Sequence, residues 1–126
     1  DDDVDVAIAG DRVGLALRNI MEESLHKGCV VVHPDSGAVK RHEWSEFTLV
    51  HAPFQKRVLA QNDIVHAAID LQFNVGRIKE IEGDSVVIDW ENPLWLRTHD
   101  CPPILITQLD AVPMRIIGIA SMKDSV

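Results

Sequence analysis

Short apolar segments recur along the chain about every ten residues, with turn-forming residues between them, and this rhythm limits the possible folds more than any other feature. The longest segment runs from Val65 to Val75, where apolar and other side chains alternate without a break. Alternation of this kind is typical of a strand with one buried face, so we expect one long strand here with a bend at Gly76. No apolar run approaches the roughly 18 residues of a membrane span. The predicted fold class is all-β.

The larger part of the chain, residues 38–122, is predicted to hold six or seven strands. Among them is a hairpin whose strands meet at Gly83 and Asp84. The remaining predicted strands lie at 45–51, 65–75, 94–97, 104–108 and 114–120. This number of strands is enough to close a small antiparallel barrel around a packed interior.

The first part, residues 1–36, contains too few elements to bury a core of its own. It is predicted to form two short strands, a helix of about two turns from Asn19 to Gly28, and an apolar strand that starts at Cys29. We therefore expect the C-terminal strands of a second, incomplete barrel. The run of aspartates at the start, without a methionine, also suggests a piece of a longer protein. Residues 123–126 are expected to form a tail.

The chain carries 12 basic and 20 acidic side chains among its 126 residues, a formal net charge of −8. This balance argues against non-specific binding to DNA or RNA, although it allows a local basic face. Cys29 and Cys101 lie far apart in the sequence, and we expect buried free thiols in the reducing environment of the cytoplasm.

Motifs of catalysis and cofactor binding are missing from the sequence. There is no Gly-x-x-x-x-Gly-Lys or Gly-x-Gly-x-x-Gly loop, no His-x-His or His-x-x-x-His pair, and no Gly-x-Ser-x-Gly elbow. We therefore expect no catalytic residue, no metal site and no cofactor in this chain. A small hydrolase would need a paired acid and base at one mouth of the barrel, and the sequence offers none.

Two basic features are candidates for binding. Arg12 follows Asp11 in a tight turn between Gly10 and Gly14, where its guanidinium could bind an anion or a carbonyl group, or form an ion pair with Asp11. Lys56 and Arg57 form a basic pair in a loop, and they are either phosphate ligands or ordinary surface residues.

Two stretches of sequence resemble translation elongation factors of the EF-Tu type. Their residues look most like those of the archaeal SelB-like branch. The first is Ala9-Gly10-Asp11-Arg12-Val13-Gly14-Leu15-Ala16-Leu17-Arg18-Asn19-Ile20 with Leu25-His26-Lys27-Gly28-Cys29-Val30-Val31, which is similar to the end of domain II. The second is Ile104-Leu105-Ile106-Thr107-Gln108-Leu109-Asp110 with Met114-Arg115-Ile116-Ile117-Gly118, which is similar to the strand pair that closes domain III.

The resemblance implies that residues 1–36 end β-barrel domain II and that residues 38–122 form β-barrel domain III. Such factors bind GTP and Mg²⁺ in a separate GTPase domain and carry aminoacyl-tRNA to the ribosome. By this likeness, Asp11 and Arg12 lie at the pocket for the aminoacyl group. Lys56 and Arg57 lie in a Pro-Phe loop on the side that faces the T stem of the tRNA. Expected partners are therefore aminoacyl-tRNA, the ribosome and the factor's own GTPase domain, with no membrane and no DNA.

Two questions stay open at this stage. SelB proper usually carries a further domain that reads an mRNA hairpin, whereas this chain stops at Val126, so the tRNA could be the selenocysteinyl, the pyrrolysyl or another special one. The alternative function, from a different class, is a protein-interaction barrel that does not bind RNA, which the net charge of −8 would suit.

Overall fold

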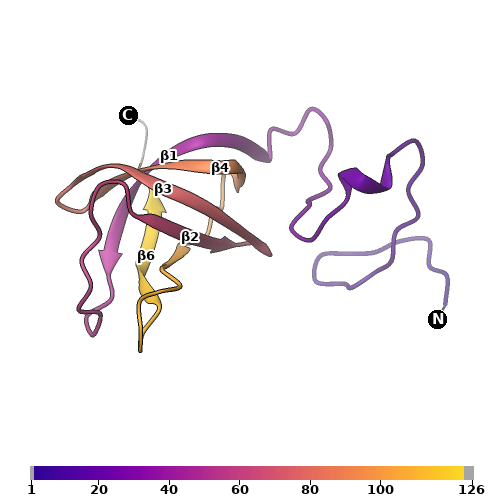
Figure 1. Cartoon of the computed structure of the whole chain (residues 1–126). Coiled ribbons are helices and arrows are strands. Elements are labelled where there is room, and N and C mark those ends of the chain that lie inside the picture. Colours follow the sequence, from indigo (N-terminus) through magenta and orange to yellow (C-terminus); the bar gives the residue numbers. More distant parts are fainter. Residues whose placement is uncertain (1, 124–126) are drawn as a thin grey trace.

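Six antiparallel strands form a closed barrel, as the computed structural model of residues 2–123 shows (Figure 1). The strands are β1 (Val39–His51), β2 (Ile64–Ile69), β3 (Gln72–Glu82), β4 (Ser85–Arg97), β5 (Ile104–Thr107) and β6 (Ile116–Met122). Around the barrel the order is β1, β4, β3, β2, β5, β6, and β6 pairs back onto β1. The predicted all-β class with a closed antiparallel barrel is confirmed. Asp1 and residues 124–126 of the expected tail lie outside the described residues.

The barrel interior is filled by alternate residues of each strand, as expected for strands with one buried face. Phe47 and Trp90 meet edge to face with their ring centroids 6.1 Å apart. The indole nitrogen of Trp90 donates a 2.9 Å hydrogen bond to the hydroxyl of Ser45, and this explains a buried serine in an apolar core. The fully buried large side chains are Phe47, Val65, Ile78, Val86, Ile88, Leu94, Leu96, Ile104, Ile106 and Ile117.

The predicted single strand from Val65 to Val75 is wrong, because the chain reverses in its middle. Asp70 and Leu71 adopt positive φ angles of 49° and 66° and form a two-residue turn between β2 and β3. Ile69 pairs with Gln72 across this turn, so Gln72 takes the core side and Phe73 becomes exposed. The Gln72 side chain is satisfied there, because its amide nitrogen donates to the Trp95 carbonyl at 2.7 Å. Its amide oxygen accepts from the Trp95 backbone nitrogen at 2.9 Å.

The predicted hairpin at Gly83 and Asp84 is confirmed as the connection between β3 and β4. The separate strand expected at 94–97 is instead the end of β4, which continues through Pro93. Pairing of β4 with β1 is interrupted between Asp89 and Leu94. Pro93 lies in this interval, where the missing backbone donor costs no hydrogen bond of that ladder.

The described part of the first segment contains no strand, contrary to our expectation of three, and the expected helix is a single 3₁₀ turn at Glu22–Ser24. Alternating apolar residues such as Val4, Val6 and Ile8 are largely exposed, since no partner strands cover them. Two or three isolated strands bury too little surface to be stable. The assignment of residues 1–36 to a second barrel stays a prediction.

Gly118 lies where β6 closes onto β1, opposite His51. A Cβ at this position would overlap the backbone carbonyl of Val50. We predict that Gly118→Ala lowers the free energy of unfolding by about 3 kcal/mol, because backbone atoms of two paired strands would have to separate. Urea unfolding measures this, with Gly14→Ala as the control, since nothing lies within 4 Å of a Cβ there. Equal stability of the two variants would contradict the prediction.

Candidate functional site

The predicted turn at Gly10 is present, with a φ of 95° at this glycine. The Asp11 carboxylate accepts a 3.0 Å hydrogen bond from the backbone nitrogen of Ile8, so Asp11 stabilises the turn. Arg12 is exposed, and within residues 2–123 it forms no ion pair with Asp11 or any other carboxylate. The structure thus separates the roles of the two residues, because Asp11 holds the turn while the Arg12 guanidinium faces solvent.

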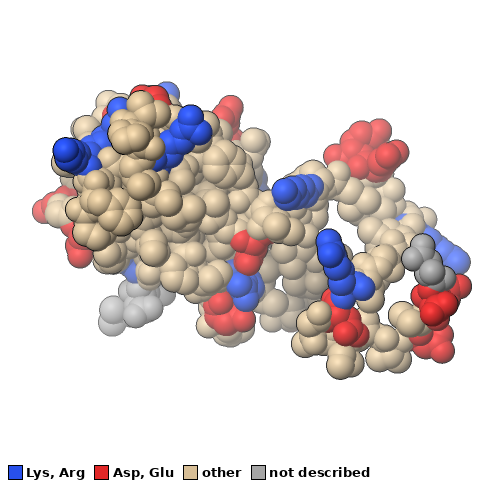
Figure 2. Space-filling view, turned by 90° about the horizontal axis from the view of Figure 1, so that it is seen from below, with Lys and Arg blue, Asp and Glu red and all other residues tan. Residues whose placement is uncertain are grey.

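Lys56 and Arg57 lie in the loop between β1 and β2, residues 52–63. This loop lies beside the loop between β5 and β6, residues 108–115, and both hang from the lower end of the barrel in Figure 1. We call these two loops together the loop end. Seen from below in Figure 2, Lys and Arg side chains gather on this end of the barrel. The cations of the loop end are Lys56, Arg57 and Arg115.

Arg57 is held by its neighbours and is only partly free. Its Nη1 contacts the Asp110 carboxylate at 2.9 Å, and its Nη2 donates to the Asp110 carbonyl at 3.3 Å. A longer contact of 3.5 Å joins Nη1 to the side-chain oxygen of Gln108. The Arg57 backbone is held as well, because its carbonyl accepts a 2.6 Å hydrogen bond from the His51 ring.

Lys56 and Arg115 are exposed, unlike the half-buried Arg57. Neither forms an ion pair within the described part of the chain. Phe54 is also exposed on this loop end. Two cations without ion pairs and an exposed aromatic ring on the same two loops can bind phosphate groups and pack against a sugar or base.

Three residues of the loop end escaped the sequence analysis as contributors to the site: Gln55, Asp110 and Arg115. Asp110 and Arg115 lie within the second stretch that carries the family resemblance and Gln55 directly precedes the basic pair, yet no local pattern indicates that the three meet. Arg57 and Asp110 are 53 positions apart, and Gln55 reaches residues 59 and 61 positions away. The pairing of β2 with β5 and of β1 with β6 brings these loops together.

A shallow hollow within the loop end, next to the start of β2, is lined by Arg57, Asn62, Asp63, His66 and Gln108, among others. The His66 ring stacks on Phe73 with ring centroids 4.8 Å apart. Its Nδ1 and the hydroxyl of Thr107 on the neighbouring strand are buried, and neither has a hydrogen-bond partner among the residues described. A buried hydroxyl without a partner costs stability.

We therefore predict that Thr107→Val raises the free energy of unfolding by about 1 kcal/mol, because an isosteric methyl group replaces the unsatisfied hydroxyl. The matched control is Thr98→Val, since the Thr98 hydroxyl donates a 2.6 Å hydrogen bond to the Gly37 carbonyl. That control should lose about 1 kcal/mol. Equal destabilisation of both variants in thermal or urea unfolding would contradict the prediction.

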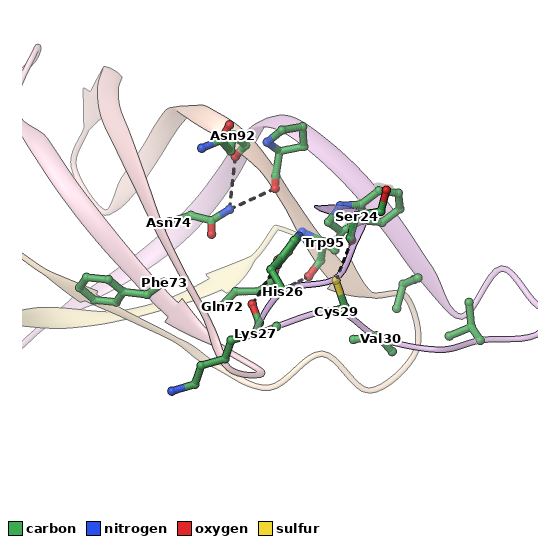
Figure 3. A pocket seen from close by; sticks show the side chains of 14 residues that line it. Ser24, His26, Lys27, Cys29, Val30, Gln72, Phe73, Asn74, Asn92 and Trp95 are labelled. Atoms are coloured by element: carbon green, nitrogen blue, oxygen red, sulfur yellow. Dashed lines mark hydrogen bonds between the residues drawn. The ribbon is translucent and has the colours of Figure 1, made fainter. Parts of the chain in front are cut away.

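A second hollow lies between residues 24–32 and the strands β3 and β4 (Figure 3). Two of its polar side chains, Gln72 and Asn74, bond to the backbone, and Asn74 donates to the carbonyls of Asn92 and Pro93 at 3.2 and 3.1 Å. Gly28 approaches closely, because a Cβ there would lie 3.1 Å from the Gln72 side chain. We interpret this hollow as a packing seam between the first segment and the barrel.

The guanidinium group of Arg97 is fully engaged in ion pairs. Arg97 binds Asp70 through two hydrogen bonds of 3.0 and 3.1 Å and Asp100 through one of 3.0 Å. The hydrogen bond to Asp70 is the main cause that raises the pKa of Arg97.

Burial raises the pKa of the nearby Cys101 thiol, which makes it a weaker nucleophile. Both cysteines are free, but Cys29 is exposed and Cys101 is half-buried, so the expectation of buried thiols is wrong for Cys29 and holds only in part for Cys101.

Residues 2–123 contain no cluster of three or more His, Cys, Asp and Glu side chains that could bind a metal ion. No helix in the same range is long and apolar enough to cross a membrane.

No protein-family model matches the chain. The chain is similar to the selenocysteine-specific elongation factor of the archaeon Methanocaldococcus jannaschii, with 50% identity over 143 aligned positions. The alignment includes 97% of this chain but 30% of the length of that factor. The resemblance to SelB-like elongation factors is confirmed. With an all-β barrel and no phosphate-binding loop motif, this chain is not the GTPase domain of such a factor.

Proposed function

Because the chain is related over nearly its whole length to SelB-like elongation factors, we propose that it is the part of a translation elongation factor that binds aminoacyl-tRNA. The barrel corresponds to domain III in this proposal, and the loop end faces the T stem. GTP and Mg²⁺ bind outside this chain, in the factor's GTPase domain, and the factor acts on the ribosome in the cytoplasm. The name of the relative favours selenocysteinyl-tRNA over other special tRNAs as the cargo.

The observation that carries the proposal is the exposure of Lys56 and Arg115 on the two loops of the loop end, which the hydrogen bonds of Gln55 join. The chain as a whole is acidic, with a net charge of −8, so an RNA can bind it only at such a local basic surface. Contacts of Lys and Arg with phosphates position a protein on an A-form helix without reading the bases. Such contacts suit a factor that recognises the shape of a tRNA stem.

The alternative is a protein-interaction barrel without RNA binding. Two exposed tryptophans, Trp44 and Trp95, favour it, because exposed aromatic residues are enriched in protein interfaces. Trp44 lies in β1 and Trp95 in β4, so both lie outside the loop end. Binding to tRNA that falls steeply with salt supports the elongation factor, whereas no binding to tRNA at any salt concentration supports the alternative.

We predict that Lys56→Ala and Arg115→Ala each lower the affinity of the intact factor for aminoacyl-tRNA by about three- to tenfold, because each removes one phosphate contact. Each should also reduce the magnitude of the slope of log affinity against log salt by about 1. Fluorescence anisotropy of labelled tRNA at several salt concentrations measures both values. The control Lys40→Ala, on β1 outside the loop end, should change neither. Unchanged affinity and slope in both loop-end variants would refute the proposed RNA surface.

Arg12 is proposed to line the pocket for the aminoacyl group. We predict that Arg12→Ala in the intact factor speeds hydrolysis of the aminoacyl ester in the complex, while the barrel unfolds at an unchanged denaturant concentration. The fraction of tRNA that stays charged over time gives the rate of hydrolysis. Arg18→Ala, in the same exposed segment, is the matched control. If the Arg12 and Arg18 variants protect the ester equally well, Arg12 has no role in the pocket.

A further inference from the structure

The hydrogen bonds of Gln55 lie on both sides of a cation of the opposite loop. The Gln55 side-chain nitrogen donates to the carbonyl of Met114 at 2.7 Å and to the carbonyl of Ile116 at 2.8 Å. Arg115 lies between these two residues in the sequence. One glutamine therefore fixes the backbone immediately before and after Arg115, as a neighbouring strand would.

The residues on either side of Lys56 are held in a similar way. It lies between Gln55, which binds the opposite loop, and Arg57, which forms the ion pair with Asp110. The Gln55 side chain also closes its own loop, because its oxygen accepts a 3.0 Å hydrogen bond from the Arg57 backbone nitrogen. The backbone of Lys56 is thus held on both sides, while its side chain stays free.

We propose that Gln55, Arg57 and Asp110 are positioning residues that set the separation of Lys56 and Arg115, so that the two cations match two phosphates of an RNA helix. We call these three residues the loop clamp. The proposal rests on the proposed function of the loop end, and it changes the role of Arg57 from a phosphate ligand to a residue that acts through its neighbours.

The physical basis is preorganisation. Phosphates of an A-form helix have fixed spacing, so two cations on mobile loops would lose conformational entropy when they bind. The loop clamp orders the loops before binding. The Asp110 carboxylate distinguishes the loop clamp from a simple basic surface. Its negative charge should weaken RNA binding, unless its ion pair with Arg57 orders the loops and so strengthens binding.

Asp110→Asn is the decisive variant. If charge alone matters, removal of this carboxylate strengthens tRNA binding by the intact factor. The loop clamp predicts the opposite, an affinity about fivefold lower, because Arg57 loses its ion-pair partner and the loops loosen. The side chain of Asp110 is 83% exposed, so the substitution should leave the barrel folded. The matched control Asp35→Asn removes the same charge from an exposed turn in the first segment and should leave affinity unchanged or slightly higher.

Arg57 variants separate positioning from direct contact. We expect Arg57→Gln to lower affinity about as much as Asp110→Asn and to leave the salt slope unchanged, because no phosphate contact is lost. The double variant with Arg57→Asp and Asp110→Arg restores the ion pair and should recover most of the affinity. Hydrogen exchange of the amides at 52–63 and 108–115 should be faster in the single variants and slower again in the double variant, without tRNA present.

These outcomes keep the two proposals distinguishable. If Asp110→Asn leaves affinity unchanged or raises it, or if Arg57→Gln reduces the salt slope as Lys56→Ala does, the loop clamp is refuted while the RNA surface stands. If Lys56→Ala and Arg115→Ala have no effect on tRNA binding, the proposed function of the loop end fails. Unchanged hydrogen exchange of both loops in Asp110→Asn would also refute the loop clamp, because it would show that the ion pair does not order them.

Discussion

The pairing of β6 with β1 closes the barrel, and the packed interior depends on this ladder. Gly118 permits the close approach of the two strands at the Val50 carbonyl. Closure leaves no open sheet edge and completes the packing of the interior residues around Phe47 and Trp90. It also fixes the start of one loop, at residue 52, next to the end of the other, at residue 115. The β2–β5 ladder places the other ends of the two loops together, so the loops are neighbours at both ends.

The sequence predicts the barrel well where short-range rules apply. The hairpin at Gly83 forms as expected, because a glycine takes the positive φ that its turn requires. The turn at Asp70 and Leu71 contains no glycine, and leucine rarely adopts positive φ. The alternation of apolar residues also continues across this turn, so the sequence does not predict it. The turn places Gln72 on the core side, where its side chain forms two hydrogen bonds with the Trp95 backbone. In the first segment the sequence predicts strands that the structure lacks, because apolar alternation alone does not produce strands without partner strands.

The candidate site is less predictable than the fold. A basic pair in a loop draws attention to Lys56 and Arg57 by composition alone, but it cannot tell that one side chain is free and the other is held. This difference arises from Asp110, which is distant in the sequence and becomes a neighbour only through the topology. Asp11 and Arg12 divide in a similar way, since the carboxylate forms the turn. In both pairs, adjacency in sequence hides a difference in hydrogen bonding.

The uneven distribution of charge also bears on the kinetics of association. The acidic residues outnumber the basic ones by 20 to 12, while Lys56 and Arg115 are exposed together at one end of the barrel. An approaching polyanion is repelled by most of the surface and attracted at that end. Under the proposed function, encounters of the tRNA in the wrong orientation would be short-lived, because the acidic remainder of the chain would repel it everywhere except at the loop end.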